Sequence, residues 1–275
     1  MIVFYIISGC LLFLIMITLF LIFPSAKKHP DTAHLKGLFI AHRGLHKNSE
    51  GIPENSLKAF ELAVANGFAI ENDIHITADG EIVVFHDDNL KRMCGVDKII
   101  EDLTLEEIKN FNLLNTGEKI PTLKECLDLI DGRVPLLIEF KCRSIINCKE
   151  LCTAANKILN NYKGRYFIQS FFPMVLKWYK KHRPDVVRGQ LAEDFKGEPI
   201  YKKMLGNMLF NVISRPHFIS YKHTSKSKIM FKLAKKLGGF PVGWTFTSEK
   251  ELNFSKNDFN TYIFENFTPY ICPKN

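Results

Sequence analysis

Three acidic side chains stand near the ends of two apolar segments, in a pattern that could hold a metal ion. Glu71 and Asp73 alternate along "AIENDIHI", and Glu139 lies in "LLIEFK". Residues two apart in a strand point to the same face, so Glu71 and Asp73 should share one space. Crowded carboxylates raise one another's pKa values unless a cation compensates. Oxygen ligands favour Mg²⁺ or Ca²⁺, with Mn²⁺ also possible, and no motif indicates zinc.

Two histidines could transfer protons beside these carboxylates. His42 ends the apolar segment "LFIAHR", and His86 ends "EIVVFH". Imidazole titrates near neutral pH, so two such rings can provide a proton acceptor and a proton donor. The sequence therefore predicts His42 and His86 as an acid/base pair.

Two cations accompany the acidic and imidazole groups. Arg43 follows His42, and Lys141 lies two residues after Glu139. Fixed cations beside a metal suit a substrate with negative oxygens, most simply a phosphate. The alternative is that they form buried ion pairs, Arg43 with Glu71 and Lys141 with Glu139. Both roles can hold at once.

Glu54 and Trp244 are two further candidates for a substrate pocket. Glu54 lies in "PENS", which is also typical of a helix start with Asn55 or Ser56 as the N-cap. Trp244 lies in "VGWTF" and could form the floor of a pocket, although a core position suits a tryptophan equally well.

The elements that must position these residues are short apolar runs alternating with helical patterns. The runs predicted as strands are "LFIAHR", "AIENDIHI", "PLLIEF", "YFIQSF", "VVRGQL", "HFISYK", "FPVGWTF" and "TYIFEN". Helices are expected between them, at residues 56–66, 122–130, 149–160, 174–182 and 229–237. Eight such units indicate an α/β protein with a (β/α)8 TIM barrel, the alternative being a doubly wound open sheet. "DGEIVVFHDD" predicts one more short strand, in the loop after the second.

An uncharged apolar run occupies residues 2–23, and Lys27 and Lys28 follow it. At about 1.5 Å per residue it spans roughly 33 Å, enough for a hydrocarbon core of about 30 Å. We predict one N-terminal transmembrane helix, with a cleaved signal peptide as the alternative. The two lysines place the remaining chain in the cytoplasm by the positive-inside rule. The domains expected are 1–27, an anchor and its flank, and 28–275, the catalytic barrel.

Charge and cysteine content narrow the class of protein. The formal net charge is +8, and the basic residues are scattered along the chain. This favours a solvated surface near membrane lipid, and we expect no nucleic-acid partner. The seven cysteines include no C-x-x-C pair, which suits reduced thiols and a cytoplasmic body. Nothing in the sequence specifies an oligomeric state.

Several of these segments, in this order, resemble the glycerophosphodiester phosphodiesterases, most of all bacterial members with an N-terminal membrane segment. The resemblance rests on "HRG", "PENS", "ENDIHITADG", "VVFHDD", "IEFK" and "WTF", and it extends over residues 38–269. It implies a barrel of the family type and metal-assisted hydrolysis of glycerophosphodiesters to sn-glycerol 3-phosphate and an alcohol, in phospholipid headgroup metabolism. Position by position, it implies metal ligands at Glu71, Asp73 and Glu139, an acid/base pair at His42 and His86, and phosphate contacts at Arg43 and Lys141.

Two positions depart from the family pattern. Asn72 stands where an apolar residue is usual, and since it should face the helices we expect a local cost in stability. Glu265 occupies the neighbourhood where many members have an Asp, and we leave it out of the predicted site.

Three readings of function stay open beside this one. The substrate could be a lysophospholipid in place of a deacylated diester, although no extended apolar groove is evident. The enzyme could be a sphingomyelinase D-like phospholipase on the same barrel, or the barrel could bind phosphorylated ligands without turnover. The intact acidic and imidazole residues favour an enzyme.

Overall fold

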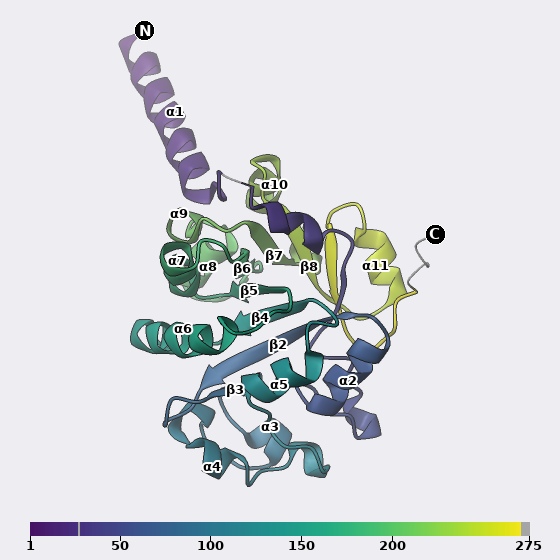
Figure 1. Ribbon diagram of the computed structural model, residues 1–275. Helices are drawn as coiled ribbons and strands as arrows, with labels where there is room; N and C mark the ends of the chain where they lie inside the picture. Colours follow the sequence, from purple (N-terminus) through teal and green to yellow (C-terminus); the bar gives the residue numbers. More distant parts are fainter. Residues whose placement is uncertain (27, 271–275) are drawn as a thin grey trace.

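In the computed structural model, which describes residues 1–26 and 28–270, eight parallel strands close into a barrel surrounded by helices (Figure 1). Strand β1 (Phe39–Ala41) pairs with β2 (Ala69–Ile76) on one side and with β9 (Thr261–Phe264) on the other. Between them follow β4 (Leu136–Phe140), β5 (Tyr166–Ser170), β6 (Arg188–Ala192), β7 (Phe218–Lys222) and β8 (Phe240–Phe246). The predicted strands and the TIM barrel are confirmed, and the β1–β2 pairing excludes an open sheet.

Helices follow most of the strands and pack on the outside of the barrel. They are α2 (Leu57–Ala65), α5 (Leu123–Ile130), α6 (Ile145–Leu159), α7 (Pro173–His182), α8 (Ile200–Gly206), α9 (Asn211–Ser214), α10 (Ile229–Lys236) and α11 (Glu249–Ser255). The five predicted helices are present. Helix α6 begins earlier than expected because the Ser144 hydroxyl accepts a hydrogen bond from Asn147 N at 3.1 Å and caps it. Helices α8, α9 and α11 were not predicted.

Side chains along each strand alternate between two apolar layers. Ile70, Ile74 and Ile138 belong to the layer that the helices cover, which also contains Cys148 and Cys152 of α6. Ile40, Leu137 and the ring of Phe218 belong to the barrel interior. Gly189 leaves the space for that ring, since a Cβ there would lie 1.9 Å from it. This alternation turns Glu71 and Asp73 inward, as the period of two predicts.

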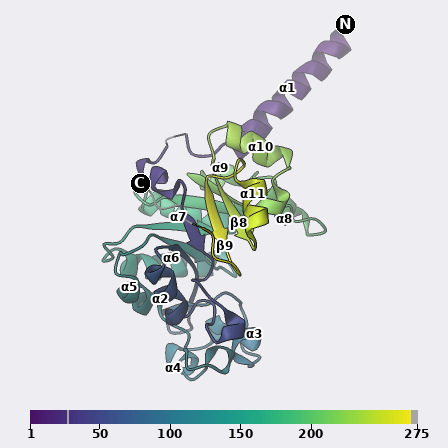
Figure 2. The same ribbon diagram turned by 90° about the vertical axis from the view of Figure 1, so that its right-hand side faces the viewer.

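A small insertion separates β2 from α5. Strand β3 (Ile82–Val84) pairs antiparallel with the end of β2, and α3 (Lys91–Cys94) and α4 (Leu105–Ile108) follow it around their own apolar cluster. The buried imidazole of His75 on β2 lies 3.1 Å from the Glu101 carboxylate of the insertion and fixes it to the barrel. The insertion lies at the bottom of both views (Figures 1 and 2).

The N-terminal helix α1 (Ile2–Ile22) projects from the opposite end of the molecule (Figures 1 and 2). Asn211 donates a hydrogen bond to Ile22 O at 2.8 Å, and Arg215 donates to Phe20 O and Phe23 O, so the last carbonyls of the helix are satisfied. Helix α1 is long and apolar enough to cross a membrane, a property that a signal sequence shares. Lys27, on which the predicted orientation partly rests, lies outside the described residues, as do residues 271–275 of the predicted catalytic domain.

Asn72 should be a weak point of the barrel. It is fully buried opposite Ile138 of β4, and neither polar atom of its side chain has a hydrogen-bond partner among the described residues. We expect Asn72→Leu to raise the free energy of unfolding by about 1–3 kcal/mol, because it removes a buried unsatisfied amide. Urea unfolding measures the change.

The matched control is Asn211→Leu, which removes a buried amide that donates a hydrogen bond to Ile22 O. This variant should lose stability. A loss of stability in Asn72→Leu as well would show that the Asn72 amide is satisfied in solution.

Candidate active site

The predicted site residues meet at the carboxyl ends of the barrel strands. A cavity of about 530 Å³ opens there, and eight of the nine line it: His42, Arg43, Glu54, Glu71, His86, Glu139, Lys141 and Trp244. The ninth, Asp73, is fully buried between Glu71 and Glu139. The structure therefore brings together side chains from β1, β2, β4 and β8 that lie far apart in the sequence.

Glu71, Asp73 and Glu139 form a compact group of buried carboxylates. One oxygen from each lies within 4.8 Å of the others, and the three residues are at most 6% exposed. Burial raises the pKa of Glu71 well above its usual value, and the charges of Asp73 and Glu139 raise it further. Burial also opposes ionisation of Asp73, but the nearby cations, led by Lys141, lower its pKa.

These residues fit a hard divalent cation. The group offers only oxygen ligands, and a cation would relieve the repulsion that disturbs Glu71. Gln169 of β5, which the sequence analysis did not identify, adds a neutral oxygen nearby: its amide nitrogen lies 3.4 Å from Glu71 Oε1, and its own buried Oε1 has no hydrogen-bond partner within residues 1–26 and 28–270. Gln169 pairs with Glu139 in the register of β4 and β5. Its position near the end of a predicted strand was the feature of the sequence that could have identified it.

Arg43 and Lys141 lie against the carboxylates. Lys141 Nζ is 2.5 Å from Glu139 Oε1 and 3.0 Å from Asp73 Oδ1, so the predicted Lys141–Glu139 ion pair is present. The Arg43–Glu71 pair is wrong as predicted, because the Arg43 guanidinium reaches Glu54 at 2.7 Å and only its backbone N–H donates to Glu71, at 3.1 Å. Both cations line the cavity and retain donors for an anion.

The backbone after β1 turns sharply to make these contacts. Arg43 and Asn55 have positive φ angles of 56° and 55°. At Gly44, with φ 81°, a Cβ would lie 2.9 Å from Ala59. The turn aims the Arg43 N–H at Glu71, and the Asn55 amide donates to Asp73 at 3.0 Å. The segment "HRG" thus orients Glu71, and the segment "PEN" orients Asp73 beside it.

Each of the two histidines is held by a carboxylate. His42 Nδ1 lies 2.6 Å from Glu265 Oε2, and His86 Nδ1 lies 2.6 Å from Asp87 Oδ1. A carboxylate partner requires Nδ1 to carry a proton, which leaves Nε2 of each neutral ring free to accept one. Burial lowers the pKa of both rings and favours this neutral form. Glu265, which was not among the predicted site residues although it lies at the end of a predicted strand, therefore belongs to the environment of His42.

Glu54 is bound to arginines on both sides. It accepts hydrogen bonds from Arg43 and from Arg92 of the insertion, which also contacts Asp87. Burial opposes its ionisation, but the hydrogen bonds from Arg92 and the charge of Arg43 lower its pKa to about 2. The carboxylate of Glu54 is thus occupied by arginines. Its clearest role is to orient Arg43, and a direct contact with a substrate is less favoured. The N-cap of α2 is Ser56, one of the two predicted candidates.

Trp244 forms part of the cavity wall and also packs on its neighbours. Its ring meets Phe171 edge to face at 5.8 Å, and Lys222 Nζ lies 5.7 Å from the ring centroid. Lys222 in turn is paired with Glu193 at 2.7 Å. Phe171 and Lys222 also line the cavity, and neither was predicted from the sequence.

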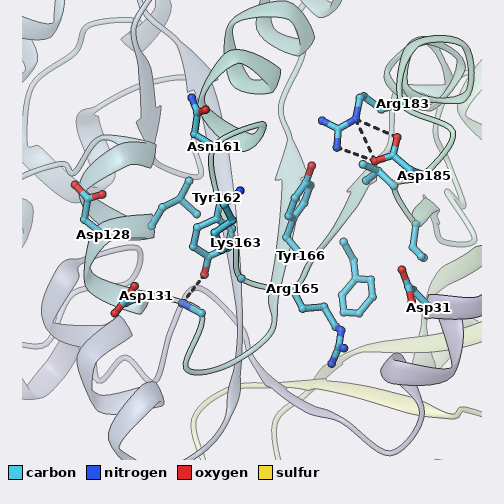
Figure 3. Close-up of a pocket in the computed structure, with 16 residues that line it drawn as sticks. Asp31, Asp128, Asp131, Asn161, Tyr162, Lys163, Arg165, Tyr166, Arg183 and Asp185 are labelled. Carbon is cyan, nitrogen blue, oxygen red and sulfur yellow. Dashed lines mark hydrogen bonds and ion pairs between the residues drawn. The ribbon is translucent and has the colours of Figure 1, made fainter.

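A second hollow, of about 800 Å³, lies at the opposite end of the barrel, around the loops that enter β4, β5 and β6 (Figure 3). Two of its charged residues, Arg183 and Asp185, form an ion pair at 2.8 Å. Tyr162 accepts a hydrogen bond from Gly132 N at 3.1 Å. None of the predicted site residues lines this hollow.

Known proteins similar to this chain share the barrel and its sequence pattern. The model of the glycerophosphoryl diester phosphodiesterase family matches residues 42–257. A glycerophosphodiester phosphodiesterase of Caldanaerobacter subterraneus subsp. tengcongensis is 37% identical over 175 residues, which are 60% of this chain and 70% of the relative. One from Bacillus altitudinis is 30% identical over 169 residues, 58% of this chain and 68% of the relative.

Solved structures share the fold at lower identity. An Oleispira antarctica phosphodiesterase, solved in complex with the product sn-glycerol-3-phosphate, aligns with a TM-score of 0.70 and 23% identity, covering 85% of this chain and 94% of that one. A glycerophosphodiester phosphodiesterase of Parabacteroides distasonis aligns with a TM-score of 0.67 and 24% identity, covering 83% and 92%.

Proposed function

Because the chain belongs to the glycerophosphoryl diester phosphodiesterase family, and is therefore a phosphoric diester hydrolase, we propose that it hydrolyses glycerophosphodiesters to sn-glycerol 3-phosphate and an alcohol with the help of a divalent metal. The observation that supports this most is the group of three buried carboxylates, flanked by two carboxylate-bound histidines and two cations, at the barrel mouth.

Glu71, Asp73 and Glu139 would hold the metal, which is Mg²⁺ or Ca²⁺ and less favourably Mn²⁺. The bound ion supplies Lewis acidity to a phosphate oxygen. Arg43 and Lys141 contribute positive charge beside it and bind the remaining phosphate oxygens. Glu54 holds Arg43 in place for this role by accepting its hydrogen bond, and Asn55 holds Asp73 by donating one to it.

His42 and His86 divide the proton transfers. One imidazole accepts through Nε2 the proton of the attacking hydroxyl, which belongs to water or to the glycerol moiety. The other, once protonated, gives its proton to the alcohol oxygen as the bond from that oxygen to phosphorus breaks. Attack by water gives sn-glycerol 3-phosphate directly, whereas attack by the glycerol hydroxyl gives a transient cyclic phosphate that water then opens to the same product. Glu265 and Asp87 fix the two rings by accepting from Nδ1 and stabilise each ring when it is protonated.

Deacylated headgroup diesters are the substrates that the cavity favours over lysophospholipids. Most of its predicted lining residues are charged, and Trp244 and Phe171 supply a small apolar wall. A long acyl chain would leave apolar surface against charged groups. The Oleispira antarctica phosphodiesterase, which shares the fold, was solved with sn-glycerol-3-phosphate, the product that hydrolysis of such a diester would release.

The chain is also proposed to be a single-pass protein of the cell membrane, with residues 1–27 as anchor and flank and residues 28–275 as a cytoplasmic catalytic domain. The apolar length of α1 supports the span. A C-terminal reporter fusion tests the orientation: activity of a reporter that works only outside the cell would reverse it.

The first experiment assays the full-length chain, purified in neutral detergent and treated with chelator, on glycerophosphoethanolamine, glycerophosphocholine and a lysophospholipid. We expect Mg²⁺, Ca²⁺ or Mn²⁺ to raise sn-glycerol 3-phosphate release from the deacylated diesters by about 10²-fold or more. Phosphorus NMR identifies the products.

Other products would contradict the proposal in distinct ways. A cyclic phosphate as the final product points to the sphingomyelinase D-like reaction. Turnover of the lysophospholipid alone reverses the substrate ranking. Binding of diesters without any turnover would identify a non-catalytic barrel.

A further inference from the structure

A second, amphipathic cavity lies where α1 meets the barrel. It has a volume of about 660 Å³ and is far from the catalytic mouth, beside the start of β6. One wall is apolar and the other is cationic. The residues that matter here are Phe20, Phe23 and Leu237 on the apolar wall, and Lys180, Arg188 and Arg215 on the cationic wall.

Arg188 is a buried cation that no carboxylate neutralises among residues 1–26 and 28–270. It is 4% exposed, and its guanidinium donates to Arg215 O at 3.0 Å and, more weakly, to Ser214 O. Within the part of the chain that the structure describes, it forms no ion pair. Burial lowers its pKa to about 10, which reflects the cost of a charge held away from water. Such a group is stabilised by an anion.

Lys180 and Arg215 add like charges at the same place. Burial and the charges of Arg188 and Arg215 lower the pKa of Lys180. Neither Lys180 nor Arg215 is paired with an acidic side chain of the described segments. Three cations without a counter-ion around one cavity, none of whose lining residues is acidic, indicate a negatively charged ligand.

The position of the cavity indicates which kind of anionic ligand it would bind. Arg215 donates to Phe20 O and Phe23 O and lies 4.8 Å from the Phe20 ring, so this cation is fixed to the end of α1. Phe20 is 61% exposed and continues the apolar surface of that helix. If α1 spans a membrane, its end lies at the level of the lipid headgroups. A free phosphate would leave the apolar wall in contact with water.

We propose that this cavity binds an anionic phospholipid, whose phosphate contacts Lys180, Arg188 and Arg215 and whose acyl chains lie along Phe20 and Phe23. The inference rests on the membrane anchor in the proposed function. It assigns the lipid a role in seating the barrel on the membrane, separate from the substrate.

The test uses the full-length chain in nanodiscs of phosphatidylcholine, with or without phosphatidylglycerol. Native mass spectrometry counts retained lipids, and thermal unfolding reports stabilisation. We expect selective retention of phosphatidylglycerol and a higher thermal midpoint in its presence. Arg188→Gln and Lys180→Gln should each weaken retention about tenfold, as expected for a charge-assisted hydrogen bond. Lys180 is exposed, so its variant keeps the test valid if Arg188→Gln misfolds.

Lys181→Gln is the matched control, since Lys181 is an exposed neighbour on α7 that does not line the cavity. Equal loss in Lys181→Gln and Lys180→Gln would overturn the site in favour of general charge attraction. Equal stabilisation by inorganic phosphate in phosphatidylcholine nanodiscs would overturn the lipid as ligand. Diester hydrolysis, measured in the same samples, tests the proposed activity separately. Resistance of the chain to carbonate extraction from membranes tests the proposed anchor.

Discussion

Glu71→Gln is expected to lower kcat/KM for release of sn-glycerol 3-phosphate by about 10³-fold, while raising the thermal midpoint of the metal-free protein. Activity falls because one of three metal-binding carboxylates is lost. Stability rises because the raised pKa of Glu71 means that its charge is unfavourable in the folded state above its ordinary pKa, and glutamine carries no charge. The two effects have opposite signs.

Thermal unfolding with and without Ca²⁺ or Mg²⁺ extends this experiment. The wild-type midpoint should rise on addition of the ion, and that of Glu71→Gln should not. Glu150→Gln, on the exposed face of α6, removes the same charge away from the site and should change neither activity nor the response to metal. A metal-free Glu71→Gln protein less stable than wild type would mean that Glu71 serves mainly as an ion-pair partner in the barrel.

His42→Ala and His86→Ala are each expected to lower kcat by about 10² to 10⁴, the usual contribution of a general acid or base. Both rings line the cavity, and each has its Nδ1 held by a carboxylate, an arrangement that suits proton transfer through Nε2. A diester with a p-nitrophenyl leaving group separates their roles. The leaving group needs little protonation, so the variant that lacks the general acid should lose much less activity on it.

The double variant should lose less than the product of the two single effects, because both rings act in one transition state. His182→Ala, on an exposed helix end far from the cavity, is the control and should keep full activity. Full activity in His42→Ala would remove the basis for the acid/base pair. Equal losses on both kinds of ester in both variants would assign the histidines to phosphate binding.

Most of the barrel was accessible from the sequence because its strands are short, apolar and regularly spaced. The period of two along β2 placed Glu71 and Asp73 on one face before any coordinates, and the ends of the strands placed Glu139 and His42 at the same mouth. Helices α8, α9 and α11 escaped detection because they are four to seven residues long, too short for a clear apolar period.

The partners of the site residues could not be predicted in the same way. Glu265 reaches His42 across 223 positions in the sequence, through the pairing of β1 with β9 that closes the barrel. Arg92 meets Glu54 only because the insertion folds back onto the mouth. Such contacts depend on how the barrel closes and how the insertion packs against it. The residue types alone gave no reason to pair Glu265 with His42 or Arg92 with Glu54.

The attachment of α1 determines which end of the barrel would face a membrane that contains this helix. The helix ends beside Pro216, just ahead of β7, at the floor of the barrel, whereas the histidines stand at the other ends of the strands. A bilayer that contains α1 would lie under this floor, and the mouth would open toward the aqueous phase. A diester still embedded in that bilayer would have to leave it before hydrolysis. With α1 as a membrane anchor, the enzyme would diffuse in two dimensions, while its substrates would arrive and its products depart in three.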